Sequence, residues 1–407
     1  MSKRVLYSVL SIGVTFLTTL VLAFPFEQGS ASHAQIPFQH FVIDDHPPSN
    51  QESKTVGDIN GDGFVDVLMS SSSKGGMVWY EYPKWHKHII DPQGSFSTDM
   101  QAADIDGDGD LDVVVPQSDA KEVRWYENPR PSGDPAGPPW KAHFLIDYRK
   151  FEFEYAHDVE VGELNGDGKL DVVICNQKWK PPRPVNKPET VVLFQNDPDS
   201  WTPVLISRTY GEGTIIVDMN GDGRPDILRP GFWLEAPTDP MHGNWVEHMI
   251  IAGWPDRAGV AAADVNQDGH LDVLLAPAES AERLSWFETA DPMQDKWTEH
   301  VIDPSIDFVH TFKIADIDLD GSPDIVFAEM QQSARKRVGF FLNRGNATKW
   351  ELQVVGTTGS HNLRVADIDS DGDIDIVGAN FNSEDDPNHG PVDLWRNLLN
   401  DRRGFKM

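Results

Sequence analysis

The sequence of 407 residues has little cysteine, few basic residues and few long apolar runs. Its one cysteine, Cys175, excludes an intrachain disulfide, and its apolar surroundings predict a small buried side chain. Apart from residues 5–24, no stretch could span a bilayer. We find no Ser-His-Asp order, phosphate loop, Cys-His pair or dinucleotide fingerprint. The formal net charge of −31 argues against nucleic acid as a partner.

The N-terminus has the pattern of an export signal. Lys3 and Arg4 precede the apolar run, and small residues at Ser32 and Ala34 allow cleavage after Ala34. We therefore expect residues 1–34 to be a signal peptide. Because the run is almost long enough for a membrane span, an uncleaved N-terminal anchor is the alternative. Either interpretation predicts a secreted, periplasmic or cell-surface protein, with no other contact with the membrane.

Residues 104–112 have the pattern of an oxygen cage for a hard cation. Aspartates stand at positions 1, 3, 5 and 9, glycine at position 6 allows a sharp turn, and position 7 offers its backbone carbonyl. An EF-hand would need a glutamate at position 12, where this chain has Val115. The segment therefore predicts a Ca²⁺ loop of a different kind.

The same nine-residue pattern occurs seven times, in loops one to seven, and predicts up to seven Ca²⁺ ions. A set of plain Asp-Gly turns is the alternative interpretation. The ligand positions of the seven loops are Asp58, Asn60, Asp62 and Asp66; Asp104, Asp106, Asp108 and Asp112; Glu163, Asn165, Asp167 and Asp171; Asp218, Asn220, Asp222 and Asp226; Asp264, Asn266, Asp268 and Asp272; Asp316, Asp318, Asp320 and Asp324; and Asp367, Asp369, Asp371 and Asp375.

Each loop lies within a repeat of about 50 residues that has four short strand patterns. The third pattern carries aromatic residues, and the fourth often begins W-x-x-H-x-I-D. Seven such repeats predict an all-β, seven-bladed β-propeller over residues 35–400, followed by a tail at 401–407. The seventh repeat lacks its fourth strand, which residues 38–45 resemble, so we expect the N-terminal strand to close the ring. An open solenoid is the alternative.

The loops resemble the FG-GAP, or VCBS, repeats of integrin α-subunit propellers and of many secreted bacterial proteins. The resemblance covers residues 38–400 and implies the propeller fold and calcium binding. Members of this family serve in adhesion, sugar binding and catalysis, so it implies no single function. We expect a carbohydrate or protein ligand at the channel mouth and at a rim formed by insertions 178–189 and 382–391.

In this family the calcium loop follows the innermost strand of each blade. Residues six positions before each loop should therefore face one another around one mouth of the central channel. Three imidazoles and two carboxylates there would suit Zn²⁺, Mn²⁺ or Fe²⁺, and blade order predicts that His310, His361 and Glu52 lie closest together. Hydrogen bonding inside the blades is the alternative role, which we assign to His88, His143, His248 and His300. The seven mouth positions are Glu52, Thr98, His157, Glu212, Ala258, His310 and His361.

A second resemblance concerns the propeller of aldos-2-ulose dehydratases, through W-x-x-H-x-I-D combined with a histidine six residues before the loop. It implies a metal-dependent lyase that removes water from keto-sugars, with His157, His310 and His361 as catalytic residues. Tyr155 would be an acid or base beside them. Three functions stay open from sequence: ligand binding without catalysis, a sugar lyase or dehydratase, and a purely structural role.

Overall fold

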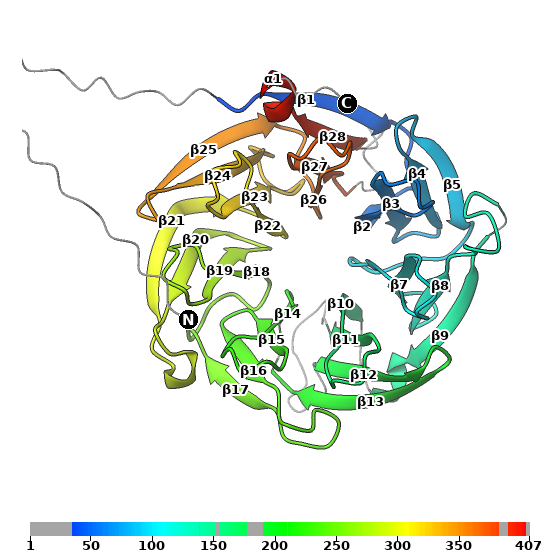
Figure 1. Cartoon of the computed structure of the whole chain (residues 1–407), viewed down its shortest axis with the longest axis horizontal. Helices are drawn as coiled ribbons and strands as arrows, with labels where there is room; N and C mark the ends of the chain where they lie inside the picture. Colours follow the sequence, from blue (N-terminus) through cyan, green and yellow to red (C-terminus); the bar gives the residue numbers. More distant parts are fainter. Residues whose placement is uncertain are drawn as a thin grey trace, which may run out of the picture. The chain divides into compact units, whose positions relative to one another are not determined.

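The computed structural model describes residues 35–137, 139–151, 155–176, 190–209, 211–381 and 390–403. The predicted export signal, insertion 178–189 and most of insertion 382–391 lie outside these residues. The residues from Ile36 onward form one compact unit. This unit is a ring of seven four-stranded sheets, and the innermost strands surround the axis (Figure 1). Within the described residues, no helix is long and apolar enough to cross a membrane.

The first four blades follow one another along the chain, and each runs from the axis outward. Blade one comprises β2 (Gln51–Gly57), β3 (Asp66–Ser71), β4 (Met77–Glu81) and β5 (His86–Asp91). Blade two comprises β6 (Gln101–Ala103), β7 (Asp112–Gln117), β8 (Glu122–Glu127) and β9 (Lys141–Asp147). Blade three comprises β10 (Ala156–Gly162), β11 (Asp171–Asn176), β12 (Thr190–Asp197) and β13 (Ser200–Ser207). Blade four comprises β14 (Ile215–Val217), β15 (Asp226–Arg229), β16 (Phe232–Glu235) and β17 (Val246–Met249).

The last three blades include the one that closes the ring. Blade five comprises β18 (Ala258–Ala263), β19 (Asp272–Pro277), β20 (Ala281–Glu288) and β21 (Thr298–Asp307). Blade six comprises β22 (Phe312–Ala315), β23 (Asp324–Ala328), β24 (Val338–Arg344) and β25 (Lys349–Gly356). Blade seven comprises β26 (Arg364–Ala366), β27 (Asp375–Gly378), β28 (Val392–Asn397) and, from the other end of the chain, β1 (Phe38–Asp44).

The closing strand is the one predicted from sequence. β1 runs antiparallel to β28, with Phe38 opposite Asn397 and Val42 opposite Asp393. The two strands lie side by side at the outer edge of the ring (Figure 1). An open edge would leave backbone groups free to pair with another chain, and this pairing removes it.

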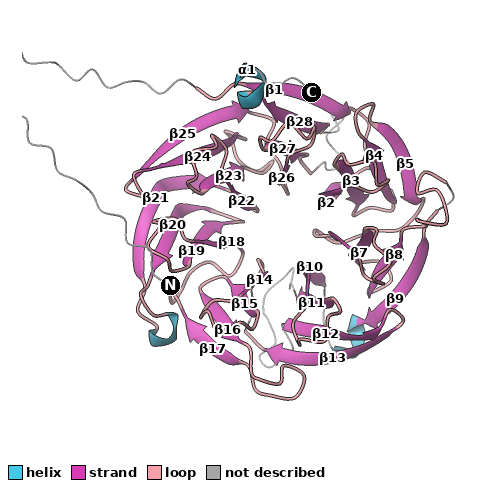
Figure 2. Cartoon of the chain, in the orientation of Figure 1, coloured by secondary structure: helices cyan, strands magenta, loops and turns pink. Residues whose placement is uncertain are grey.

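Helical structure is scarce among the described residues (Figure 2). The described residues contain two 3₁₀ turns, η1 (Tyr148–Phe151) and η2 (Pro292–Gln294), and one short helix, α1 (Leu399–Arg403). α1 spans the expected boundary between the propeller, which was predicted to end at residue 400, and the tail at 401–407, and no helix was expected there. Nearly all regular structure is therefore β-sheet.

The hydrophobic core lies between neighbouring blades. Residues of the second strands are buried on both faces, because each blade packs against a blade on either side. Trp125 of blade two, for example, shares a buried cluster with Val172 and Leu193 of blade three. Cys175 is buried, and its Sγ lies 2.9 Å from the Thr214 hydroxyl. The lone cysteine therefore has the structural role that its sequence context predicts.

The W-x-x-H histidines hold the outer strands to the blades. His143 stacks on Trp125 with ring centroids 4.1 Å apart, and its Nε2 lies 2.7 Å from Glu127. Equivalent pairs of a stacked tryptophan and a bonded glutamate occur at His88, His248 and His300. All four lie on outermost strands, so their role is structural.

Candidate functional site

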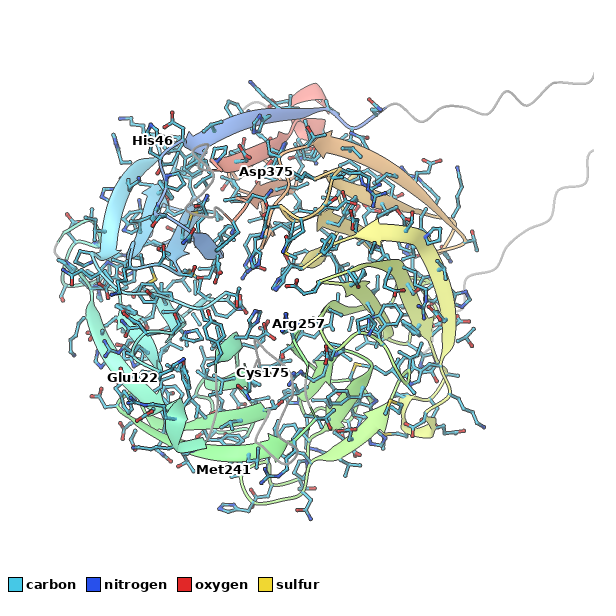
Figure 3. All side chains as sticks on the ribbon, turned by 180° about the vertical axis from the view of Figure 1, so that it is seen from behind. His46, Glu122, Cys175, Met241, Arg257 and Asp375 are labelled. Atoms are coloured by element: carbon cyan, nitrogen blue, oxygen red, sulfur yellow. The ribbon has the colours of Figure 1, made fainter. Side chains whose placement is uncertain are left out.

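The seven predicted mouth positions stand at the start of the innermost strands. Glu52 and His157 are the second residues of β2 and β10, and His310 precedes β22 by two residues. Glu212 and His361 precede β14 and β26 by three residues. Arg257, which pairs with Glu212, lies near the centre of the ring, whereas Glu122 and Met241 lie at its edge (Figure 3). The ring thus brings side chains from separate blades together at the axis.

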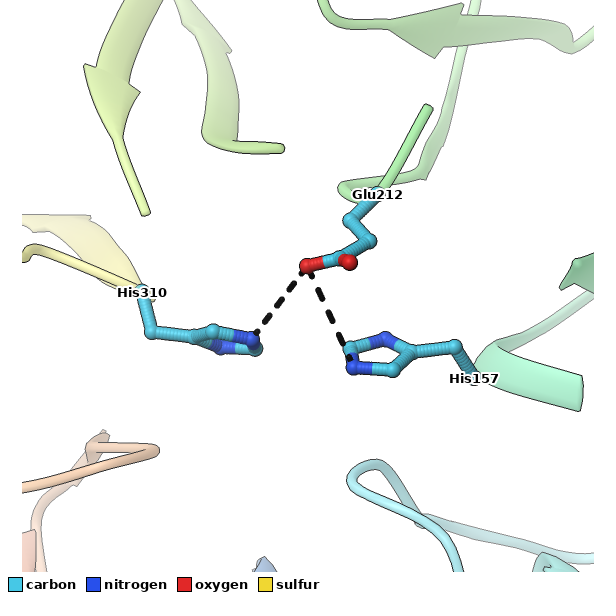
Figure 4. Close-up of side chains that lie close together, drawn as sticks. All are labelled: His157, Glu212 and His310. Carbon is cyan, nitrogen blue, oxygen red and sulfur yellow. Dashed lines mark ion pairs between the residues drawn. The ribbon is translucent and has the colours of Figure 1, made fainter. Parts of the chain in front are cut away.

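Three of these residues, His157, Glu212 and His310, form the tightest group, which we call the axial cluster. Oε2 of Glu212 lies 4.0 Å from His157 Nε2 and 3.8 Å from His310 Nε2 (Figure 4). One ligand atom from each residue lies within 4.8 Å of the other two. All three side chains are almost completely buried. The cluster therefore joins blades three, four and six across the channel.

Both imidazoles of the axial cluster are fixed in orientation by a hydrogen bond at Nδ1. His157 Nδ1 lies 2.7 Å from Asp158 Oδ1, and His310 Nδ1 lies 3.0 Å from Asn362 Oδ1. Because both partners are oxygens that only accept hydrogen bonds, each Nδ1 donates its proton. The two Nε2 atoms face the Glu212 carboxylate. Metal-binding histidines commonly have this arrangement, with one nitrogen toward the ion and the other bonded to a carboxylate or carbonyl.

His361 and Glu52 lie outside this tightest group, and here the structure corrects the grouping expected from blade order. His361 stacks on His310 with ring centroids 4.5 Å apart, and its Nδ1 is buried without a hydrogen-bond partner among the described residues. The expected trio of His310, His361 and Glu52 is not brought within ligand distance. Glu212 of blade four approaches both His157 of the adjacent blade three and His310 of blade six. The contact with His310 shows that side chains on non-adjacent blades can meet more closely than some on neighbouring blades.

Burial and charge give the three histidines different protonation. Burial opposes a charge on His157, but the carboxylates of Glu212 and Asp158 outweigh it and raise its pKa to about 9. Burial, reinforced by the charge of His157, lowers the pKa of His310 to about 4. Burial and His310 hold the pKa of His361 well below its usual value. The carboxylates thus favour one positive charge in the cluster, which a proton or a metal cation can supply.

Three further side chains, Tyr155, Arg257 and Glu52, interact with the axial cluster. Burial raises the pKa of Tyr155 to about 12, helped by the charge of Glu52, and the tyrosine ring lies 6.2 Å from that of His157. Arg257 Nε lies 3.0 Å from the other oxygen of Glu212. Burial also raises the pKa of Glu52 to about 7, against the charge of His157. Tyr155 is therefore protonated at neutral pH, and Arg257 orients Glu212.

Glu212 and His310 also border a cavity of about 60 Å³. Its wall further includes Glu160, Lys313 and Arg364. Arg364 Nη2 lies 2.8 Å from Asp99 Oδ1, so at least one cation in this wall is paired with a carboxylate. A cavity of this volume has room for about two water molecules.

The residues of the axial cluster fit a divalent transition metal. Two imidazoles and one carboxylate are the protein ligands of several catalytic zinc sites and of many non-haem iron sites, which leave further positions for water or substrate. Both Nε2 atoms face Glu212, and both Nδ1 atoms are bonded elsewhere. A metal ion would take the place of the proton that His157 Nε2 carries at neutral pH. Nitrogen ligands disfavour Ca²⁺ at this position.

The seven acidic loops lie where each innermost strand turns into the second strand. In loop two, Asp104 accepts hydrogen bonds from the backbone of Gly107 (2.8 Å) and Gly109 (3.1 Å), and so closes the turn. Oxygens of Asp104, Asp106 and Asp108 lie within 4.8 Å of one another. This donor set of oxygens fits Ca²⁺. The residue at position 4 of every loop has a positive φ, as does the glycine at position 6. The requirement at position 4 was not expected from the sequence.

Position 9 of the loops has a structural role that the sequence did not reveal. Each position-9 aspartate begins the second strand of its blade. In loop two, Asp112 accepts hydrogen bonds from Ile105 N (3.0 Å) and from Asn128 N of the third-strand side (2.8 Å). The same carboxylate therefore ties the loop to the blade and is also a candidate calcium ligand.

Sequence reasoning also missed Asp158 and Asn362, which position the two histidines. Both stand one residue after a mouth position. Successive side chains along a strand point to opposite faces, so these two were not expected beside the mouth histidines. The sign available in the sequence was a polar residue directly after a mouth histidine, which could have indicated a hydrogen-bond partner for a histidine. Its partner could not be inferred, because Asn362 follows His361 in sequence but bonds to His310 of the neighbouring blade.

Comparison with protein families identifies the repeat. Residues 58–115, 163–228, 264–327 and 316–378 match the FG-GAP-like repeat and together cover more than half of the chain. The chain belongs to the FG-GAP repeat family. Within this FG-GAP propeller, each matched segment begins at position 1 of a loop, so the family signal centres on the loops and the strands beside them.

Among curated proteins, the propeller is similar to T-cell immunomodulatory proteins of Mus musculus and Rattus norvegicus. The identity is 22% over 200 residues for the mouse protein, which is 46% of this chain and 32% of that protein. For the rat protein it is 22% over 228 residues, or 53% and 36%. The chain therefore spans about a third of the length of these relatives.

Comparison with solved structures gives two matches at low identity. A lectin of Agrocybe aegerita that recognises non-reducing terminal N-acetylglucosamine has a TM-score of 0.53 and 17% identity, covering 83% of this chain and 91% of the lectin. The biofilm matrix protein Bap1 of V. cholerae has a TM-score of 0.43 and 11% identity, covering 89% and 91%. At these identities the likeness concerns the fold alone.

Proposed function

We propose that this FG-GAP propeller binds a divalent transition metal at the axial cluster and acts on a carbohydrate as a metal-dependent lyase or dehydratase. The observation that supports the proposal is the orientation of His157 and His310. Each is held through Nδ1 and presents Nε2 to Glu212 in a buried site. The resemblance of short motifs to aldos-2-ulose dehydratases points to the same class of reaction.

Removal of water from a keto-sugar needs a base for the C–H proton beside the carbonyl and an acid for the leaving hydroxyl. When bound, a metal ion at this site would polarise the carbonyl as a Lewis acid. His361 is neutral at neutral pH because of its lowered pKa, and its free Nδ1 can accept the proton. Tyr155 keeps its proton at neutral pH and can donate it to the leaving hydroxyl, which departs as water.

Metal analysis of the purified protein tests this proposal. After dialysis against Zn²⁺, Mn²⁺ or Fe²⁺ and removal of loose ions, we expect one equivalent of transition metal per chain. His310→Ala and Glu212→Gln should each lose it. His300→Ala is the matched control, because it removes a histidine from an outermost strand and should keep the metal. A wild-type protein that retains none of the three metals would contradict the proposal.

Catalysis is tested separately by incubating the metal-loaded protein with keto-sugars and polysaccharides and following the ultraviolet absorbance of an unsaturated product. We expect His361→Ala to keep the metal and lose this product. If the metal is retained but no product forms from any sugar, a second function is favoured. In that case the propeller binds a carbohydrate or protein at the mouth without converting it, in keeping with the binding roles of FG-GAP propellers.

We also propose that the protein is exported and that its acidic loops bind Ca²⁺. The pattern of residues 1–34 supports export. Carboxylates at positions 1, 3 and 5 converge in loops two, six and seven, and this convergence supports calcium binding by loops of this kind. High extracellular Ca²⁺ suits loops of this kind.

A further inference from the structure

We propose that loops six and seven do not take up calcium, because an arginine of the same blade already supplies the positive charge between their carboxylates. The protein would then bind calcium at loops one to five only. This inference rests on the proposed calcium binding of the other loops. It concerns two loops that have full sets of carboxylates and would look like the best sites from sequence.

In loop six, the arginine lies between the side chains that would hold the ion. Arg344 Nη1 lies 2.6 Å from Asp318 Oδ2 and 2.8 Å from Asp320 Oδ2, which are positions 3 and 5. Arg344 Nε lies 3.5 Å from Glu351 on the neighbouring outer strand. The guanidinium is therefore held from two sides. Its charge-assisted bonds use oxygens that a cation in this loop would need.

Loop seven has the same arrangement with a different arginine. Arg396 Nε contacts Asp369, and its Nη2 lies 3.3 Å from Asp371 Oδ2 and 3.4 Å from Asp401 of α1. Asp369 is 3% exposed. Two arginines from different strand positions thus reach positions 3 and 5 in two neighbouring blades.

The short helix α1 also covers loop seven. Asn400 donates its backbone N–H to Asp373 Oδ2 (2.9 Å) and its side-chain amide to the Asp371 carbonyl (2.8 Å). Asp373 is completely buried. An ion entering this loop would have to displace both α1 and the guanidinium.

Loop two is the contrasting case within the same chain. It has aspartates at the same four positions, and Asp110 adds a fifth carboxylate whose two oxygens are buried without hydrogen bonds among the described residues. No ion pair to Asp104, Asp106 or Asp108 is found in the part of the chain that the structure describes. The third-strand residue beside this loop is Glu127, and the equivalent residue in blade seven is Arg396. Loop two therefore needs a cation from solution.

Basic side chains also touch loops three and four, but in a different way. Lys169 and Arg224 occupy position 7 of their own loops, and among the loop carboxylates each contacts the one at position 5, Asp167 or Asp222. Each also donates a hydrogen bond to a backbone carbonyl outside the loop, and neither bridges positions 3 and 5. Only loops six and seven have one guanidinium across positions 3 and 5 among the described residues.

Calcium counting on the full chain tests the inference. The protein is stripped with EGTA, dialysed against a defined Ca²⁺ concentration, and analysed for bound calcium per chain. We expect five ions for wild type and one more for Arg344→Gln and for Arg396→Gln. Arg124→Gln is the matched control, since Arg124 is a third-strand arginine paired with Glu122 away from the loops, and its count should stay at five.

The outcomes separate the two proposals. Seven ions in wild type would overturn the inference and leave calcium binding intact, whereas no calcium in any variant would overturn both. Hydrogen exchange on the wild-type protein is a second test, and it does not depend on whether a variant folds. Peptides covering residues 104–112 should exchange faster in EGTA than in Ca²⁺, and peptides covering 316–324 and 367–375 should exchange equally in both. Faster exchange of these two loops in EGTA would also refute the inference.

Discussion

Asp375→Ala tests how much the position-9 carboxylates contribute to stability. Asp375 is fully buried, and it accepts hydrogen bonds from Ile368 N (3.1 Å) and Asn397 N (2.7 Å). Its removal leaves two buried N–H groups without an acceptor. Each unsatisfied group costs about 1–3 kcal/mol, so the free energy of unfolding should fall by about 2–6 kcal/mol.

Asp375→Asn keeps one acceptor oxygen but turns an amide N–H₂ toward the second N–H group. We therefore expect an intermediate loss of about 1–3 kcal/mol for this variant. Asp401→Ala is the control, because Asp401 is a half-exposed residue of the same region and surface substitutions usually change stability by less than about 0.5 kcal/mol.

Urea denaturation followed by tryptophan fluorescence measures these differences. Because Asp375 belongs to a loop that Arg396 already neutralises, its loss should cost the same in Ca²⁺ and in EGTA. Asp112→Ala in loop two should cost more in Ca²⁺ than in EGTA, since it removes a calcium ligand as well. A loss below about 1 kcal/mol for Asp375→Ala, or a smaller loss than for the asparagine variant, would refute the reasoning.

Three further perturbations address the ring, the calcium and the axial cluster. Deletion of residues 35–45 removes β1 and exposes the edge of β28, so we expect aggregation; a soluble monomer of wild-type stability would contradict the role of β1. EGTA should lower the melting temperature, and Ca²⁺ but not Na⁺ should restore it, because bound ions stabilise the folded state; identical melting curves of stripped and loaded protein would argue against calcium binding. Transition-metal affinity should rise as the pH increases from 7 to 9, since a metal must displace the proton that His157 keeps through its raised pKa of about 9, whereas His310, with a pKa of about 4, is already neutral; isothermal titration over this range measures the rise, and an affinity independent of pH would contradict it.

The repeat in the sequence was enough to predict the fold. Seven loops at regular spacing, each followed by a β-branched strand, specify seven similar blades, because strand pairing within a blade is local in sequence. The closing strand was also predictable, since residues 38–44 have the pattern missing after β28. Equivalent positions in a ring must lie at the same height, and for this reason the candidate residues His157, Glu212 and His310 could be named from sequence.

Tertiary structure decided which of those residues meet and which charges are already paired. Distances across the channel depend on side-chain length and on the tilt of each blade, and neither has a local pattern in sequence. Glu212 therefore meets His157 of the neighbouring blade three and His310 of blade six, whereas blade order favoured a group of His310, His361 and Glu52. In the sequence, nothing distinguishes Arg344 and Arg396 from other strand residues. Only the folded blades show that their guanidinium groups contact aspartates of loops six and seven. An acidic motif describes the oxygens that one segment offers, whereas the charge that neutralises them comes from residues distant in sequence.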